Sequence, residues 1–150
     1  MSESTAPTVE EALRTHNAPI VGRPDDVEPK LGRFNNTTQM VFKPSAEDPT
    51  QPNAGIINYL PGAGFPLHMH DFAQVWYVVE GECRYGDTTL HQGDLVYMKD
   101  PHFEHEMSTE DGCRILFLQY QGPTTGKGPI YEGRFDVEEV KAVEEEDLRR

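Results

Sequence analysis

The segment GAGFPLHMHDFAQVWYVVEG, residues 62–81, brings together residue types that bind metal ions. His68 and His70 are separated by one residue, and Gln74 follows four positions later. Side chains of equal parity point to the same face of an extended strand. Two imidazoles and an amide would therefore project together beside the apolar run that begins at Val75. This spacing predicts a site for a divalent metal ion.

A second histidine cluster, GDLVYMKDPHFEHEM, contains His102 and His105, whose opposite parity allows only one of them to share the inner face of a strand. We expect the apolar face to point inward, because Phe103 and Met107 lie on it. This assigns His105 as the third imidazole ligand. The face expected to point toward solvent carries His102, Glu104 and Glu106.

Three imidazoles and one amide oxygen, from His68, His70, His105 and Gln74, suit a divalent first-row transition metal better than calcium or magnesium. Four protein ligands leave one or two coordination positions open, which is typical of catalytic rather than structural sites. Without a carboxylate among the ligands, the ion would keep its full double positive charge. It would then favour a small substrate that binds as an anion.

The composition excludes several classes of partner. The chain has 150 residues, with 13 Lys and Arg against 26 Asp and Glu, so its net charge is -13. This charge repels nucleic acids and anionic membranes, and no segment approaches the ~20 apolar residues that span a bilayer. Cys83 and Cys113 lie outside any CxxC pattern, and the N-terminus does not resemble a secretory signal. We therefore expect a cytoplasmic protein with free thiols.

Residues 35–121 are predicted to form one all-β barrel or sandwich, because β-branched and aromatic runs alternate there with Gly, Pro and Asp. Residues 1–34 form an extension with one short helix, for which Thr8 and Glu11 have capping-box spacing. Residues 122–150 are predicted to form a Gly/Pro loop and an acidic helix that starts near Asp136. The run RILFLQY is apolar on both faces, which favours a homodimer.

The spacing of these histidines and glycines resembles that of the cupin family. Residues 62–81 resemble the first cupin motif, G-x5-H-x-H-x3,4-E-x6-G, with Gln74 in the position of the glutamate. The second motif, G-x5-P-x-G-x2-H-x3-N, is matched less closely. Gly93 opens it, but Pro101 is displaced and His105 follows one residue after the position of the motif histidine. No Asn follows that histidine.

The resemblance implies a double-stranded β-helix, or jelly-roll barrel, with a metal near its mouth and often a dimer. A site of three histidines and one glutamine is similar to those of certain manganese hydroxynitrile lyases and of an isomerase in dipeptide antibiotic synthesis. Three-histidine sites otherwise resemble those of thiol, diketone and flavonol dioxygenases, most of which use Fe(II). Fe(II) or Mn(II) is therefore expected, and Ni, Co and Zn also fit such a ligand set.

Three functions follow from this sequence. A dioxygenase for a small organic acid, enol or phenol is favoured narrowly over a non-redox lyase, isomerase or cyclase, and the third function is non-catalytic binding of a small ligand. The non-redox reaction needs a general base within reach of the substrate. The candidate bases are Tyr59, His102 and Tyr120. The residues expected to line the substrate pocket are Met40, Phe42, Trp76 and Phe117.

Overall fold

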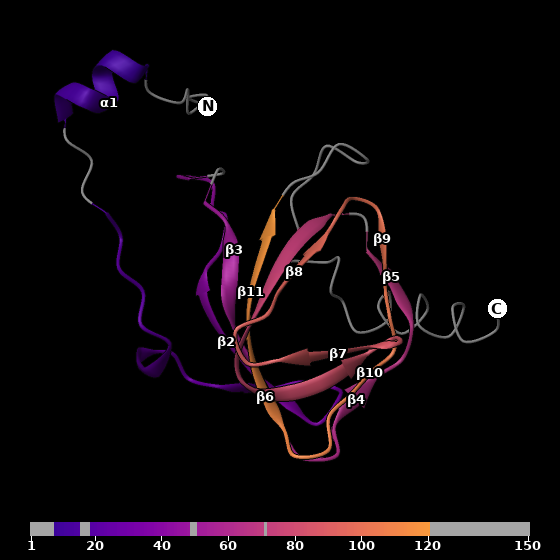
Figure 1. Cartoon of the computed structure of the whole chain (residues 1–150). Coiled ribbons are helices and arrows are strands. Elements are labelled where there is room, and N and C mark those ends of the chain that lie inside the picture. Colours follow the sequence, from indigo (N-terminus) through magenta and orange to yellow (C-terminus); the bar gives the residue numbers. More distant parts are fainter. Residues whose placement is uncertain (1–7, 16–18, 49–50, 71, 121–150) are drawn as a thin grey trace.

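The computed structural model describes residues 8–15, 19–48, 51–70 and 72–120, and within them the chain consists mainly of β-strands and the turns that join them (Figure 1). The prediction of an all-β fold is confirmed. The strands are β1 (Lys30–Leu31), β2 (Asn36–Phe42), β3 (Asn53–Tyr59), β4 (Gly64–Phe65), β5 (His68–His70), β6 (Ala73–Tyr85), β7 (Thr88–His91), β8 (Leu95–Met98), β9 (His102–Glu104), β10 (Met107–Ser108) and β11 (Cys113–Tyr120). Two short helices precede the barrel, α1 (Val9–Thr15) and the 3-10 helix η1 (Pro24–Asp26).

The long strand β6 holds the barrel together, because it pairs with four other strands. Its first half pairs with β8 on one side and β11 on the other, and β11 continues the sheet to β3 and β2. Its second half pairs with β7 and β10. Strands β5 and β9 form a separate antiparallel ribbon. In Figure 1 this ribbon lies on the side of the barrel opposite β2 and β3.

Gly81 marks the point where β6 changes partners. It has a positive φ of 77°, and a Cβ added there would lie 2.4 Å from the carbonyl oxygen of Gly112. Only glycine adopts this conformation without strain and also allows the neighbouring backbone to approach so closely. The glycine that closes the histidine-rich segment therefore has a structural role.

We expect Gly81→Ala to lower the free energy of unfolding by roughly 2–6 kcal/mol, because the backbone strain and the steric conflict each cost ~1–3 kcal/mol. Gly62→Ala is the matched control. Gly62 has a similar φ of 82°, but nothing lies within 4 Å of its added Cβ, so the substitution isolates the strain. Urea unfolding of both variants measures the difference. Equal losses of stability would show that the close approach to Gly112 contributes nothing.

The inner faces of the strands enclose an apolar core. Trp76, Val78, Ile115 and Phe117 are at most 2% exposed, and Trp76 and Phe117 are direct partners across β6 and β11. The alternation along β6 confirms that Gln74, Trp76 and Val78 share the inner face, as their parity predicts. The core therefore ends, along β6, at the buried amide of Gln74.

Outside the barrel, the predicted capping box of α1 is confirmed. The backbone N–H of Thr8 donates to the Glu11 carboxylate at 2.8 Å, and the backbone N–H of Glu11 donates to the Thr8 hydroxyl at 3.2 Å. The predicted acidic C-terminal helix lies outside the described residues. Among the residues that the structure describes, no helix has the length and apolar character needed to cross a membrane.

Candidate metal site

The β5–β9 ribbon presents polar side chains to the barrel interior. In its register His68 pairs with Glu104, Met69 with Phe103, and His70 with His102. His68 and Glu104 are 9% and 4% exposed, whereas the intervening pair, Met69 and Phe103, is 45% and 43% exposed. The ribbon thus turns its apolar pair toward solvent and its histidines and carboxylate inward.

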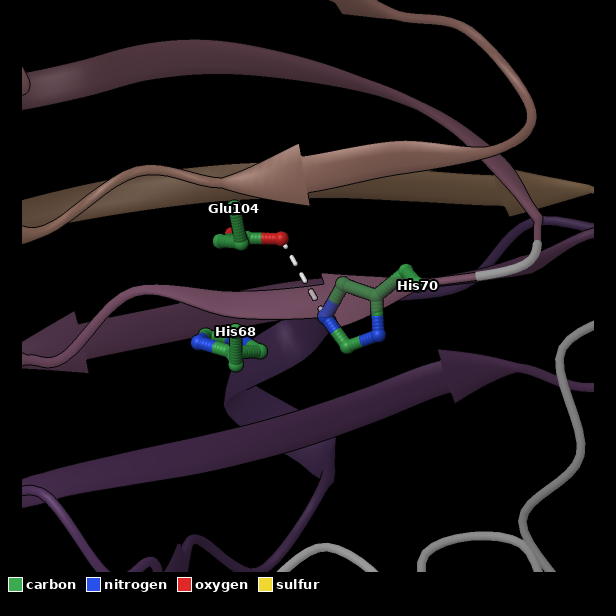
Figure 2. A group of neighbouring side chains, drawn as sticks. All are labelled: His68, His70 and Glu104. Atoms are coloured by element: carbon green, nitrogen blue, oxygen red, sulfur yellow. Dashed lines mark ion pairs between the residues drawn. The ribbon is translucent and has the colours of Figure 1, made fainter. Parts of the chain in front are cut away.

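Three of these side chains converge inside the barrel (Figure 2). One potential ligand atom from each of His68, His70 and Glu104 lies within 4.8 Å of the other two. The Nε2 atom of His70 is 3.2 Å from a Glu104 carboxylate oxygen. The Nδ1 atom of His68 is 2.7 Å from the carbonyl oxygen of Pro66. Because a carbonyl only accepts hydrogen bonds, the proton of His68 is on Nδ1, and Nε2 is the nitrogen that carries the lone pair.

The carboxyl group of Glu104 is ionised in this environment. Burial by itself would raise its pKa, but the surrounding imidazoles, of which His70 lies 3.2 Å from the carboxylate, together lower it more. The pKa of Glu104 therefore lies well below its ordinary value. A buried carboxylate in its charged form can bind a cation.

The residues present fit a divalent transition metal. Two imidazoles and one carboxylate form the ligand set known from non-heme iron sites that keep open coordination positions. The contact of His68 with the Pro66 carbonyl is the kind of support that orients histidine ligands in metal sites. His70 is supported by Phe72, whose ring stacks on the imidazole with a centroid distance of 4.5 Å. The site thus has both the ligands and the contacts that fix them.

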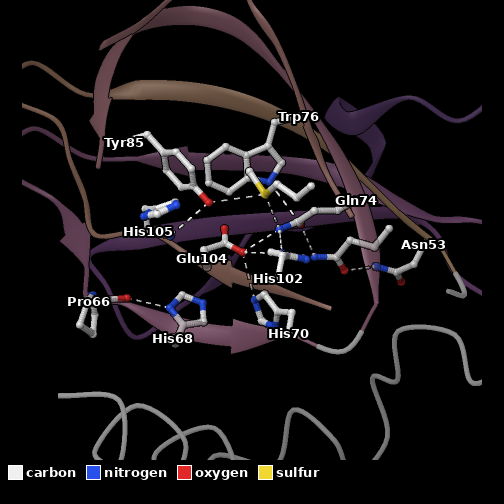
Figure 3. A network of polar contacts seen from close by, with 12 residues as sticks. Asn53, Pro66, His68, His70, Gln74, Trp76, Tyr85, His102, Glu104 and His105 are labelled. Carbon is white, nitrogen blue, oxygen red and sulfur yellow. Dashed lines mark hydrogen bonds and ion pairs between the residues drawn. The ribbon is translucent and has the colours of Figure 1, made fainter. Parts of the chain in front are cut away.

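His102 lies beside this group and points inward, which corrects the prediction that it faces solvent (Figure 3). Its side chain is 7% exposed, and its Nε2 is 3.6 Å from a Glu104 carboxylate oxygen. Its Nδ1 is 2.9 Å from the carbonyl oxygen of Lys99, to which it donates. The Nε2 atom is consequently an acceptor that faces Gln74 at 3.1 Å.

The prediction that His105 points inward is wrong. His105 is exposed, packs edge-on against the Tyr85 ring, and lies apart from His68 and His70 in Figure 3. The prediction requires one continuous strand from residue 102 to 107, but β9 ends at Glu104 and β10 begins at Met107. The alternation of side chains between the two faces therefore does not continue from β9 into β10. Met107 is buried as expected, and Glu104, expected on the solvent face, is buried too.

Gln74 reaches the site, but with its nitrogen rather than its oxygen. Its Oε1 is 3.3 Å from the indole Nε1 of Trp76, which can only donate a hydrogen bond. Its Nε2 is 2.6 Å from a carboxylate oxygen of Glu104, which can only accept one. Both contacts give the same orientation of the amide. Since an amide nitrogen has no lone pair to offer, Gln74 does not present a ligand atom in this arrangement.

Of the candidate bases, only His102 lies beside the carboxylate. Tyr59 is 7% exposed in the apolar core, where burial raises its pKa, and Tyr120 is 37% exposed at the end of β11. Trp76 and Phe117, expected in the substrate pocket, belong to the packed core, and Met40 packs against that core. Phe42 is half-buried at the end of β2.

Glu104 is the residue that sequence reasoning missed, although the motif contained a signal for it. Counting G-x5-P-x-G-x2-H strictly from Gly93 places the histidine position at residue 104, where this chain has glutamate. Each motif therefore departs from the cupin pattern at one ligand position. The first has Gln74 in place of its glutamate, and the second has Glu104 in place of its histidine.

Comparisons with known proteins agree with this architecture. Residues 53–124 match the family model described as the AraC-like ligand binding domain. No curated protein matches the sequence at a significant level.

Several solved structures have a similar fold. An RmlC-like cupin from Shewanella frigidimarina is 22% identical with a TM-score of 0.58, and the match covers 77% of this chain and 95% of that one. An acetylacetone dioxygenase from Acinetobacter johnsonii is 14% identical with a TM-score of 0.55, covering 85% and 93%. A polyketide cyclase from Streptomyces resistomycificus is also 14% identical with a TM-score of 0.55, covering 84% and 99%. The chain therefore has the cupin fold.

Proposed function

We propose that this protein is a metal-dependent enzyme in which His68, His70 and Glu104 bind a divalent metal ion, and that it acts as a non-heme dioxygenase on a small organic acid, enol or phenol. One observation carries the proposal, the convergence of two histidines and one ionised carboxylate inside the barrel. Two-histidine, one-carboxylate sites are characteristic of Fe(II) oxygenases. A dioxygenase among the similar folds is consistent with this reaction class.

The charge of the site favours a monoanionic substrate. With one carboxylate among the ligands, a divalent ion keeps a single positive charge, one less than a set of neutral ligands would leave. When bound, Fe(II) would supply open positions for substrate and O2. The buried walls formed by Phe65 and Phe72, whose rings contact His68 and His70, limit the access of water to the two imidazoles.

His102 is the residue placed to handle a proton. Its Nδ1–H is fixed on the carbonyl of Lys99, so a proton from an enol or phenol bound beside Glu104 would go to Nε2, in exchange for the contact of that atom with the Gln74 amide at 3.1 Å. A positioned base in this place would deliver the substrate as its anion. Neither Tyr59 nor Tyr120 lies beside the Glu104 carboxylate.

Oxygen uptake tests the reaction class. Protein loaded with Fe(II) without air is mixed with a panel of acetylacetone, catechol, a 2-oxo acid and a thiol, and O2 consumption is followed on exposure to air. We expect uptake with at least one compound, one mole of O2 for each mole of substrate lost. Metal binding without uptake on any of the four would count against the oxygenase and leave the metal site intact.

The alternative is a non-redox lyase, isomerase or cyclase that uses the metal to stabilise an enolate. It is favoured by the similarity in fold to a polyketide cyclase, in which the match covers 84% of this chain and 99% of the cyclase. Turnover that persists without O2, and with Mn(II) or Zn(II) in place of Fe(II), would select it. Stoichiometric retention of a ligand without turnover would instead support the binding role suggested by the AraC-like family match.

We also propose that the chain forms a homodimer through the outer face of β6, β8 and β11. Tyr77 is the direct partner of both Leu95 and Leu116, so the three side chains share one face. Tyr77, Leu95 and Leu116 are 39%, 72% and 38% exposed. An exposed apolar patch of this kind is typical of a protein–protein interface. Sedimentation velocity of the full chain tests this proposal, and a mass of one chain at micromolar concentration would refute it.

A further inference from the structure

We propose that a chain of three amides, Asn53, Gln119 and Gln74, positions the carboxylate of Glu104 for metal binding, so that Gln74 acts as a positioning residue rather than as a ligand. This inference rests on the proposed function, since it concerns the same metal site. In Figure 3 the amide of Gln74 lies between Asn53 and Glu104.

The line follows a single row of the sheet. Asn53 of β3 is the direct partner of Gln119 in β11, and Gln119 is the direct partner of Gln74 in β6. The Asn53 amide donates to Gln119 Oε1 at 3.0 Å, and the Gln119 amide donates to Gln74 Oε1 at 3.0 Å. The Gln74 amide then donates to Glu104 at 2.6 Å.

The direction of these hydrogen bonds is fixed at the end beside the metal site. Glu104 accepts only, so the nitrogen of Gln74 faces it and the oxygen of Gln74 faces away. That oxygen needs donors, and it receives them from Trp76 and from the nitrogen of Gln119. The oxygen of Gln119 in turn faces Asn53. Each amide thus determines the orientation of the next.

The last amide holds two groups of the site at once. One N–H of Gln74 is directed to Glu104, and the other is shared between His102 Nε2 at 3.1 Å and Met98 Sδ at 3.0 Å. Gln74 is 1% exposed and Glu104 is 4% exposed, so water has little access to the hydrogen bond between them. If the amide of Gln74 turned over, its oxygen would face both acceptors. Gln119 prevents this by keeping that oxygen engaged.

Gln119→Leu tests the proposal without touching a metal ligand. The variant removes one of the two donors to Gln74 Oε1 and leaves Trp76 as the other. We expect it to weaken Co(II) binding by about 10–100-fold, the usual effect of removing a group that orients a metal ligand. Co(II) alone is the probe. Its affinity is measured by equilibrium titration, and its visible absorption spectrum reports the ligand geometry, which we expect to change.

Gln39→Leu is the matched control. Gln39 is another buried glutamine of the same sheet, 7% exposed, and its amide donates to the carbonyl of Pro24 at 2.8 Å instead of to the site. We expect it to lose stability on thermal unfolding and to keep wild-type Co(II) affinity and spectrum. The proposal is refuted if Gln119→Leu is folded and binds Co(II) as wild type does, or if both variants lose affinity equally. Failure of the wild type to bind Co(II) would instead remove the proposed function itself.

Discussion

Glu104→Gln is expected to abolish metal binding at micromolar metal, with a loss of affinity of more than about 100-fold. This exceeds the ~10–100-fold effect of groups that only orient a ligand, because the substitution changes a ligand itself. Glutamine has nearly the shape of glutamate, so the packing around residue 104 is preserved. The negative charge that neutralises part of the ion's charge is lost. Titration with Mn(II), followed by the paramagnetic resonance signal of the free ion, measures the affinity.

Glu106→Gln provides the control for this experiment. Glu106 is two residues further along the chain and exposed, and the same change of charge there alters the net charge of the protein equally. We expect its Mn(II) affinity to stay within about twofold of wild type, the range of ordinary surface substitutions. Tight Mn(II) binding by Glu104→Gln would mean that the carboxylate is not a ligand.

The second large effect is expected for His68→Ala, which removes an imidazole whose orientation is fixed by the Pro66 carbonyl and whose Nε2 carries the lone pair. We expect Fe(II) affinity to fall more than about 100-fold and oxygen uptake to disappear with it. A far-ultraviolet circular dichroism spectrum checks that the barrel persists. Added imidazole partly restores metal binding if the loss is that of a ligand rather than of the fold.

His105→Ala distinguishes the metal site of the structure from the one that the sequence motif suggests. The motif suggests His105 as a ligand, whereas the structure has it exposed against Tyr85. We therefore expect His105→Ala to keep Fe(II) affinity within about twofold of wild type. An equal and large loss in His68→Ala and His105→Ala would contradict the arrangement described here and favour the three-histidine site.

Much of the fold is predictable from local sequence. The β-branched runs form strands, the Gly-Asp pairs at residues 86–87 and 93–94 flank β7, and the capping box starts α1. These features depend on residues a few positions apart, whose chemistry fixes turns and helix ends. The inner face of β6 is predictable for the same reason, because its alternation is unbroken from Gln74 to Val78.

The facing of residues 102–107 is not predictable by the same rule. An apolar residue is expected to point inward, yet Phe103 pairs with Met69 on the solvent side of the β5–β9 ribbon. The buried polar residues on the other side are stabilised by partners from distant segments, such as Gln74 for Glu104. Hydrogen-bonded partners make such burial favourable, and parity within one strand cannot reveal them.

The role of Gln74 depends on still more distant residues. Its position in the histidine-rich segment suggests a ligand, and only the indole of Trp76 and the amide of Gln119 show that its oxygen is already engaged. Gln119 lies 45 residues further along the chain, and Asn53 lies 66 residues before Gln119. Strand order decides that these amides share a row of the sheet, and the spacing of the motif does not contain that order.

Metal content is the most direct test of the claim that His68, His70 and Glu104 form a metal site. The full chain is purified without added metal or chelator, loaded anaerobically with Fe(II) or Mn(II), and passed through a desalting column. Its metal is then measured by elemental analysis against the concentration of the chain. A metal site at these residues requires one ion per chain for the wild type and almost none for Glu104→Gln. A wild-type chain that retains none of Fe, Mn, Co, Ni or Zn would contradict it.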